Sequence, residues 1–265
     1  MTRRAIQTAF WILATAGLGF VILRPLENKL LYFPDREDYG SPSDAGLAYT
    51  DVNLVASDGV RLHAWHVKVA QPVALVIHFH GNAGNLSGRV PFAAAFAGAR
   101  MDTLLVDYRG YGRSEGTPSE EGLYRDADAA WAWAEPRGLP VVVYGESLGG
   151  AVAIDLASRR RPALLVAQST FTRLAEMADR TIPFGGALVS QKYDSISKIG
   201  RVEASVLVVH GDADEIVPFE MGRTLFGRVR SRKEFLRLAG VHHNDLVERA
   251  GPEVAARMAA MLRSE

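Results

Sequence analysis

Two Gly-x-Ser-x-Gly pentapeptides, at residues 112–116 and 145–149, hold the serines of this chain that are best placed to act as nucleophiles. Such a serine is reactive when it lies on a sharp turn joining a strand directly to a helix, because its hydroxyl is then exposed above the sheet. Ser147 has the flanks that this turn requires. The β-branched run Val141–Val143 precedes it, and residues 148–156 continue with apolar side chains at helical spacing. We predict that Ser147 is the nucleophile.

The other serine, Ser114, lacks these flanks. The run Leu104–Val106, which predicts the preceding strand, ends well before it, and Gly110 and Gly112 lie in the gap. A Thr-Pro dipeptide follows soon after in place of an uninterrupted helix. Serine in such a glycine-containing segment is typical of a turn. We therefore interpret Ser114 as a turn residue.

A serine hydroxyl stays protonated at neutral pH unless a base removes its proton, so the chain must also supply a histidine and an acid. In the fold that carries this turn, these partners follow the serine in the order acid, then histidine, each in a loop after a late strand. Residues 205–210 predict such a strand, and the acidic loop 211–215 follows it. Residues 234–238 predict a shorter strand, which leads into the loop 240–245 with two histidines. The required order is satisfied.

Each of these loops offers two candidates. Asp212 and Asp214 are both able to orient an imidazole, and His242 and His243 are both able to act as the base; spacing does not choose between them. An acid in a turn commonly caps or stabilises the turn, so one aspartate is expected to have that role. The other histidines are interpreted as packing or hydrogen-bonding residues: His63, His66, His78, His80 and His210.

The negative charge that develops on the substrate oxygen needs backbone N–H donors. One comes from the residue after the nucleophile, which is Leu148, and the other from a loop after an earlier strand. Residues 73–79 predict that strand, and the loop 80–85 contains glycines that let the backbone turn sharply and approach a ligand. We predict that Asn82 is the second donor.

Two other motifs in these loops do not support a cofactor. The pair in His78-Phe79-His80 resembles some zinc sites, but no acid or further histidine follows closely. The segment Gly110-Tyr111-Gly112 follows a strand, yet its third glycine is wrongly spaced for a dinucleotide fingerprint and no helix begins there. We expect neither a metal nor a cofactor.

Together these motifs resemble the α/β-hydrolase superfamily of serine hydrolases, and most of all its membrane-anchored branch that includes protein depalmitoylases and lysophospholipid hydrolases. The resemblance extends from about Leu31 to the C-terminus and rests on Tyr32-Phe33-Pro34 and on residues 80–85, 107–114, 145–149, 210–214 and 243–245. It implies that Asp214 is the acid, that His243 is the base and that Ser114 lies in a structural loop. One departure is His242, which stands where a glycine is common.

Length and charge fit this interpretation. The chain has 265 residues, enough for one α/β domain after an N-terminal segment, and strands alternate with helices as in a mostly parallel sheet covered on both faces. Residues 49–55 and 60–67 predict an opening pair of strands. Thirty basic and thirty acidic residues balance, so nothing favours nucleic acid as a partner. The absence of cysteine excludes disulfides and a thiol nucleophile.

The N-terminus predicts a membrane anchor over residues 1–26. Residues 5–23 carry no charge and, at 1.5 Å per residue, would span roughly 28 Å as a helix, enough to cross the hydrocarbon core of a bilayer. A cleaved signal peptide is the alternative, because residues 14–16 have the small-x-small form; against it, the chain stays apolar beyond that site. Basic residues on both sides balance, so neither orientation of this single-pass helix is favoured.

Residues 27–46 are expected to form a polar linker and residues 47–265 the catalytic domain. Between two predicted strands, residues 171–201 exceed what one crossover helix needs, and we interpret them as a short lid insertion. A crossover helix plus a surface loop is the alternative. The candidate substrate-binding residues of this insertion are apolar: Phe171, Phe184 and Leu188.

The sequence therefore predicts a membrane-anchored serine hydrolase that cleaves acyl esters or thioesters through an acyl-enzyme. Its expected partners are a small-molecule or lipid acyl substrate, with a hydrophobic acyl group favoured, and the bilayer around the N-terminal helix; the sequence carries no signal for the oligomeric state. The alternatives are a serine peptidase of the same fold and a catalytically silent, membrane-tethered scaffold.

Overall fold

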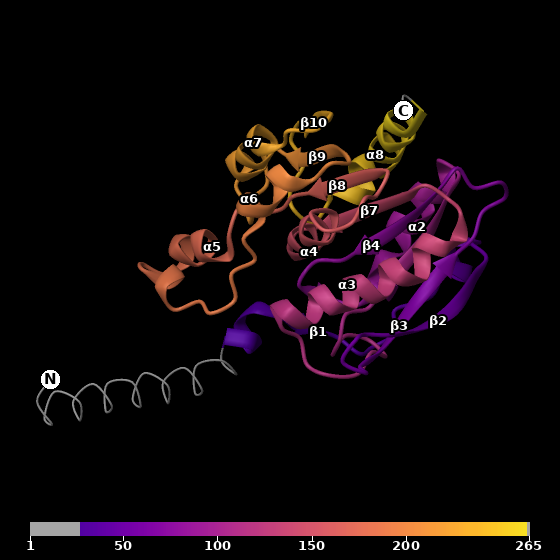
Figure 1. The fold of residues 1–265 in the computed structure, drawn as a ribbon, viewed down its shortest axis with the longest axis horizontal. Coiled ribbons are helices and arrows are strands. Elements are labelled where there is room, and N and C mark those ends of the chain that lie inside the picture. The colour runs from indigo at the N-terminus through magenta and orange to yellow at the C-terminus, as the bar shows by residue number, and fades with distance from the viewer. Residues whose placement is uncertain (1–26, 264–265) are drawn as a thin grey trace, which may run out of the picture.

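The computed structural model describes residues 27–263, and a central sheet of eight strands organises them (Figure 1). The strand order is β10-β9-β8-β7-β4-β6-β3-β2. All neighbours are parallel except at one edge, where β2 pairs antiparallel with β3, and β3 with β6. The strands are β2 (Tyr49–Val55), β3 (Arg61–Val67), β4 (Ala74–Phe79), β6 (Met101–Val106), β7 (Val141–Glu146), β8 (Leu164–Gln168), β9 (Ser205–Gly211) and β10 (Lys233–Leu238). The predicted mostly parallel sheet is confirmed.

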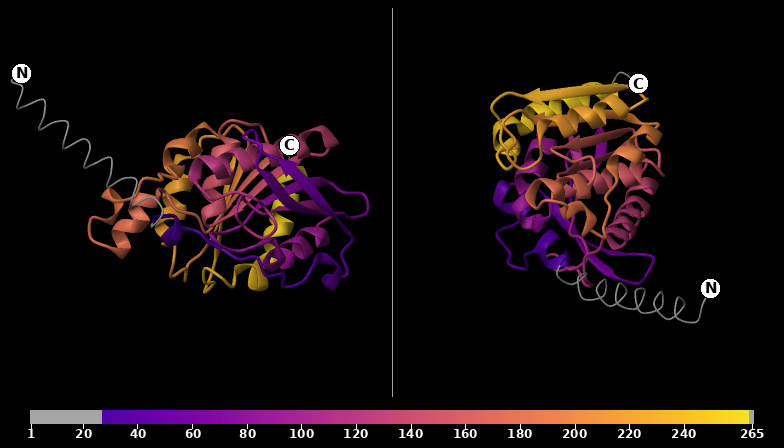
Figure 2. Two further views of the ribbon diagram at one scale, coloured as in Figure 1. Left: turned by 90° about the horizontal axis from the view of Figure 1, so that it is seen from below. Right: turned by 90° about the vertical axis from the view of Figure 1, so that its left-hand side faces the viewer.

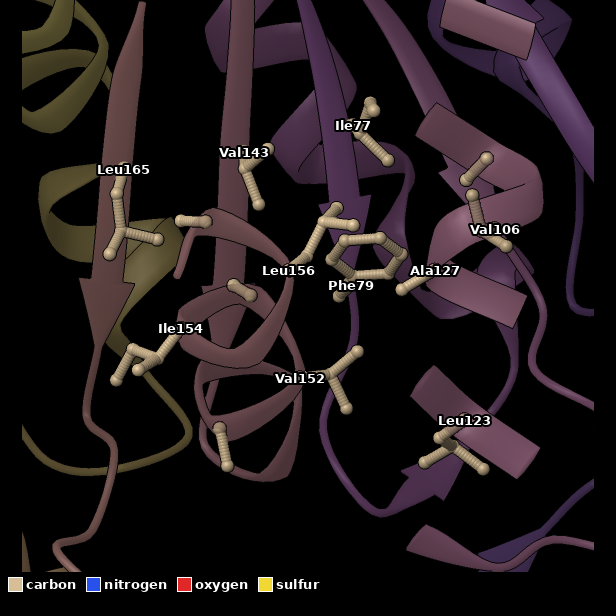
Figure 3. Packing of buried hydrophobic residues seen from close by; sticks show 14 of the residues in the cluster. Ile77, Phe79, Val106, Leu123, Ala127, Val143, Val152, Ile154, Leu156 and Leu165 are labelled. Carbon is tan, nitrogen blue, oxygen red and sulfur yellow. The ribbon is translucent and has the colours of Figure 1, made fainter. Parts of the chain in front are cut away.

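Helices cover both faces of this sheet (Figures 1 and 2). Alternate side chains of a strand point to opposite faces, so Val143 of β7 joins one hydrophobic cluster while Val142 and Tyr144 join the other. The first cluster includes side chains of α3, α4 and α7, and Figure 3 shows those of α3 and α4 packed on the sheet. The second includes side chains of α2 and α8. These helices are α2 (Val90–Gly98), α3 (Glu120–Ala134), α4 (Leu148–Ala157), α7 (Phe219–Arg228) and α8 (Leu246–Arg263).

A sharp turn joins β7 directly to α4. Ser147 stands at this turn with φ of 52° and ψ of −116°, a left-handed conformation that costs a side-chain-bearing residue about 1–3 kcal/mol. The turn is held by close packing: a Cβ atom placed on Gly145 would lie 2.1 Å from the carbonyl oxygen of Gly149, and one on Gly149 would lie 2.0 Å from that of Phe79. Only glycine fits at these two positions, so α4 starts immediately against β4.

A second, two-stranded sheet lies outside the central one. Its strands are β1 (Phe33–Pro34) and β5 (Ala83–Gly84), which pair in parallel. Residues 27–46, which the sequence predicts to be a polar linker, are thereby tied to the domain, and Tyr32 within them is buried.

The predicted lid insertion contains several short helices between β8 and β9. They are α5 (Leu174–Thr181), η4 (Gly185–Ala187), α6 (Ser195–Lys198) and η5 (Ile199–Arg201). In Figures 1 and 2, α5 lies away from the layers that cover the sheet. The side chains of Ile182, Phe184 and Leu188 in this part of the chain are exposed.

The predicted anchor over residues 1–26 lies outside the residues that the structure describes. From residue 27 to residue 263, none of the helices combines the length and the apolar character that crossing a membrane requires.

Gly149→Ala should destabilise the domain, because the new methyl group meets backbone rather than a movable side chain. We expect a loss of about 1–3 kcal/mol or more in the free energy of unfolding, measured by urea denaturation. Gly227→Ala is the matched control, since nothing lies within 4 Å of its Cβ position in α7. Equal stability of the two variants would contradict the close packing of α4 against β4.

Candidate active site

Ser147 lines a cavity of about 290 Å³ whose walls come from loops far apart in the sequence. Gly81 and Asn82 of the loop after β4 lie on one side, and His243 from the loop after β10 lies on another. The cavity therefore forms where several parallel strands end, as is general for ligand sites of open α/β sheets. The remaining lining residues are Ala83, Gly88, Arg89, Phe92, Glu146, Gln168, Ser169, Ile216, Asn244, Leu246, Val247 and Glu248.

His243 and Asp214 form a close pair. The His243 Nδ1 atom lies 2.8 Å from Oδ2 and 3.0 Å from Oδ1 of Asp214, so it donates its proton to an ionised carboxylate. The Asp214 side chain is fully buried and that of His243 is 9% exposed. A proton on Nδ1 leaves Nε2 unprotonated in the neutral ring, so Nε2 is available as a base.

The Asp214 carboxylate is stabilised in its charged form. Burial by itself would raise its pKa, but hydrogen bonds from His210 and His243, together with the Val217 N–H, outweigh burial and hold the pKa well below the usual range. The Val217 N–H donates at 2.8 Å and the Ile216 N–H at 3.0 Å. Asp214 is therefore ionised at neutral pH and provides His243 with a charged partner.

The competing candidates are used elsewhere. Asp212 accepts hydrogen bonds from the Arg237 guanidinium, at 2.7 and 2.9 Å, and from the Gly240 N–H, at 2.7 Å. The exposed His242 ring contacts Glu215 through Nδ1 at 3.1 Å. Neither residue lines the cavity at Ser147. The geometry therefore separates alternatives that the spacing leaves open.

Ser147 and His243 line the same cavity, but the hydroxyl of Ser147 makes no hydrogen bond to His243 within the described part of the chain. Such bonds are commonly long without substrate and shorten when it binds. The backbone of Ser147 is fixed at both ends: its N–H donates to the Gln168 carbonyl at 2.9 Å, and its carbonyl accepts from the Thr170 hydroxyl at 2.7 Å. The position of Ser147, the predicted nucleophile, is therefore set by its backbone.

The loop after β4 leaves one N–H group free. The Gly81 N–H donates to Glu146 Oε1 at 3.1 Å, whereas the Asn82 N–H has no partner among residues 27–263. Asn82 lines the cavity, and a Cβ on Gly81 would lie 3.7 Å from the Ser147 Cβ. The N–H of Leu148, the first residue of α4, has no acceptor in its own helix. Both predicted donors are thus unpaired beside Ser147.

His80 fixes the peptide that carries the Asn82 N–H. Burial, reinforced by the charge of Arg89, lowers the pKa of His80 to about 3, so the ring is neutral at ordinary pH. Its Nδ1 lies 2.7 Å from the Gly81 carbonyl and donates to it. Because the peptide unit is planar, holding the Gly81 carbonyl also fixes the direction of the Asn82 N–H.

An ion pair inside the cavity was not expected from the sequence. Arg89 and Glu146 are in contact and both line the cavity, with side chains 21% and 15% exposed. Arg89 also donates to the Ala83 carbonyl at 3.0 Å. The place of Glu146 directly before Ser147 was a signal available in the sequence; nothing there distinguished Arg89 from other surface arginines.

The predicted substrate-binding residues do not reach this cavity. Phe171 is buried in the hydrophobic core, and Phe184 is 86% exposed. Leu188 lines a separate apolar groove of about 380 Å³ between residues 27–31 and the α5 region. The other lining residues of this apolar groove are Glu27, Leu30, Leu31, Leu174, Met177, Ala178, Thr181, Ile182, Gly185 and Val189.

Ser114 is a buried structural residue. Its hydroxyl donates to the Asp107 carbonyl at 2.8 Å and accepts from the His63 N–H at 2.9 Å. Both capacities of the hydroxyl are used in holding its loop against β3, and Ser114 is not among the cavity residues.

Comparisons with known proteins agree with this fold. The serine aminopeptidase S33 family matches residues 70–198. An uncharacterised protein of Mycobacterium tuberculosis is 39% identical over 252 residues, covering 91% of this chain and 89% of that protein. The α/β hydrolase domain-containing protein WAV2 of Arabidopsis thaliana is 31% identical over 243 residues, which cover 81% of this chain and 79% of that protein. An esterase of Pyrococcus furiosus superposes with a TM-score of 0.74 at 20% identity, covering 88% of this chain and 98% of its own.

His243→Ala and Asp214→Asn should lower ester turnover severely, because one removes the predicted base and the other its charged partner. For Asp214→Asn we expect a fall on the order of 10⁴-fold in kcat, as for a triad that loses its carboxylate. His242→Ala and Asp212→Asn are the matched controls and should keep most activity in the same p-nitrophenyl ester assay. An inactive His242→Ala beside an active His243→Ala would transfer the base assignment to His242.

Proposed function

This chain belongs to the α/β-hydrolase family, and we propose that it cleaves acyl esters or thioesters through an acyl-enzyme on Ser147. The observation that supports this most strongly is the convergence in one cavity of Ser147 on a left-handed turn, His243 paired with Asp214, and the free N–H of Asn82. Acyl transfer requires a nucleophile, a base with its orienting acid and an oxyanion donor, and these residues supply all of them.

In the proposed first half-reaction, the Ser147 oxygen attacks the acyl carbon while His243 Nε2 takes the hydroxyl proton. The carbonyl oxygen becomes negatively charged and is bound by the N–H groups of Asn82 and Leu148. Asp214 holds the Nδ1 tautomer and stabilises the imidazolium that forms. His243 then gives its proton to the leaving alcohol or thiol as the bond to the acyl carbon breaks.

In the second half-reaction, His243 removes a proton from water, whose oxygen attacks the acyl carbon of the Ser147 ester. The same two N–H groups bind the second oxyanion. Collapse returns the proton from His243 to Ser147 and releases a carboxylic acid. The proposed chemistry uses only residues of this chain and water.

We propose a hydrophobic acyl group as substrate because the apolar groove lies next to the cavity. Leu31 lines the apolar groove, and its carbonyl accepts a hydrogen bond at 3.0 Å from the side chain of Asn82, which lines the cavity. An acyl chain that starts at Ser147 and extends past this contact would enter the groove between Leu31 and Leu188. Each methylene buried there would contribute about 0.8 kcal/mol. In this proposal the insertion that contains α5 acts as a lid.

Anchoring to a membrane by residues 1–26, and membership of the membrane-anchored branch, remain part of the proposal. The support is the uncharged stretch 5–23 and the exposed Leu30 and Leu188, which line the same groove as Glu27, where the described structure begins. Sodium carbonate extraction of cell membranes checks this: the full chain should stay in the pellet, and release into the supernatant would contradict anchoring.

Peptide hydrolysis is the second candidate function, because the matching family is described as a serine aminopeptidase. The same residues would act on an amide, with His243 protonating the leaving amine. Parallel assays with aminoacyl p-nitroanilides and p-nitrophenyl esters separate the two. A higher kcat/KM on the anilides would favour the peptidase.

Ser147→Ala should abolish ester hydrolysis, with a loss on the order of 10⁶-fold in kcat, because no other group supplies the nucleophile. A fluorophosphonate probe should label the wild type and leave Ser147→Ala unlabelled. Ser114→Ala is the control and should retain labelling if it stays folded, since the Ser114 hydroxyl is structural. Absence of labelling in the wild type would instead favour a catalytically silent scaffold.

Lengthening the acyl chain of a soluble ester from two to about eight carbons should raise kcat/KM, because each added methylene leaves water for the groove. Leu188→Ala and Ile182→Ala should flatten this rise, because both residues line the groove. Val55→Ala, at a comparably exposed apolar residue of β2, is the control and should leave the rise unchanged. A preference for acetyl esters over all longer chains would contradict the hydrophobic acyl substrate.

A further inference from the structure

Residues 27–35, which we call the strap, run between two parts of the molecule that are far apart in sequence. Leu31 contacts the loop that carries Asn82, and Glu27 contacts Ser190 and Gln191 of the lid insertion, which lie between η4 and α6. The strap lies between the uncharged N-terminal stretch and the catalytic domain. Its hydrogen bonds assign it a role that a simple linker does not have.

The strap forms hydrogen bonds with two polar groups of Asn82, its carbonyl and its side-chain amide. The Phe33 N–H donates to the Asn82 carbonyl at 2.9 Å, and the Asn82 side-chain amide donates to the Leu31 carbonyl at 3.0 Å. The Tyr111 hydroxyl adds a third bond, to the Asn82 carbonyl at 2.7 Å. Further along, the Asp35 N–H donates to Gly84 at 3.1 Å. Within residues 27–263 the Asn82 N–H is thus the backbone group of this residue that remains free for a ligand.

The strap is also bonded to the lid insertion, through Glu27 and Tyr32. The Glu27 carboxylate accepts the N–H groups of Ser190 and Gln191, each at 2.9 Å, and the Ser190 hydroxyl at 2.5 Å. The buried Tyr32 hydroxyl contacts Gln191 at 2.5 Å and the Tyr193 hydroxyl at 2.6 Å. The strap therefore cannot shift without breaking bonds at residues 190–193 as well.

We propose that the strap is a positioning element of the active site, which holds the Asn82 N–H in the oxyanion hole and links it to residues 190–193 of the lid insertion. This rests on the proposed acyl transfer. An oxyanion donor acts only when it points at the place where charge develops, so holding its neighbours stabilises the transition state more than the bound substrate. At the oxyanion hole the strap acts through Asn82, whereas its Leu31 lines the apolar groove that we propose for the acyl chain.

Phe33→Pro and Phe33→Ala form a matched pair that tests this. Both remove a half-exposed side chain, but only proline also removes the N–H that Asn82 accepts. We expect Phe33→Ala to resemble the wild type. Phe33→Pro should lose on the order of ten-fold or more in kcat, with KM nearly unchanged, since loss of a whole oxyanion donor costs 10²–10³-fold. Asn82→Ala, which keeps the backbone N–H but loses the bond to Leu31, should fall in the same way.

The inhibition constant of a trifluoromethyl ketone separates positioning from general damage. This inhibitor forms a tetrahedral oxyanion on the serine, so its inhibition constant should rise in proportion to the loss of kcat/KM. Phe33→Pro and Asn82→Ala with the kinetics of Phe33→Ala would overturn the proposal, as would a fall in kcat with an unchanged inhibition constant. A wild type that neither the ketone nor a fluorophosphonate inhibits would instead contradict the proposed function itself.

Discussion

The left-handed backbone at Ser147 is the constraint on which the site depends. A residue with a side chain adopts φ of 52° only where its surroundings enforce it, and here Gly145 and Gly149 allow α4 to start against the end of β4. That approach brings the loop after β4, with Gly81 and Asn82, beside the Ser147 side chain. The proposed nucleophile and one proposed oxyanion donor are therefore placed by a single packing contact.

The charge states of Asp214 and His80 also fix the geometry of the site. Asp214 remains charged although buried, because four donors from residues 210–217 and 243 surround it, whereas burial keeps His80 neutral as a donor to the Gly81 carbonyl. Asp214 is charged and His80 is neutral, yet both orient a neighbouring group. Asp214 orients the His243 ring, and His80 orients the peptide that joins Gly81 to Asn82.

The sequence predicted the sheet and the order of Ser147, Asp214 and His243 because both follow local rules: β-branched runs for buried parallel strands, and a chain order for loops at strand ends. Choosing Asp214 over Asp212 needed the family resemblance, since both aspartates lie in the same turn. The Arg89–Glu146 pair and the strap were missed because they join residues that no local pattern relates. Phe184 and Leu188 were predicted to bind substrate because they are apolar, but neither lines the cavity at Ser147. The sequence does not show that α5 lies away from the layers that cover the sheet (Figure 1).

The central claim is that Ser147 carries the acyl group between the two half-reactions. Mixing the enzyme with a p-nitrophenyl ester, quenching with acid within milliseconds and digesting with trypsin isolates Ser147 in the peptide of residues 138–159, and Ser114 in that of residues 114–125. We expect the mass of one acyl group on peptide 138–159, formed in a burst that precedes steady turnover. Turnover with the acyl group on peptide 114–125, or on neither peptide, would contradict it.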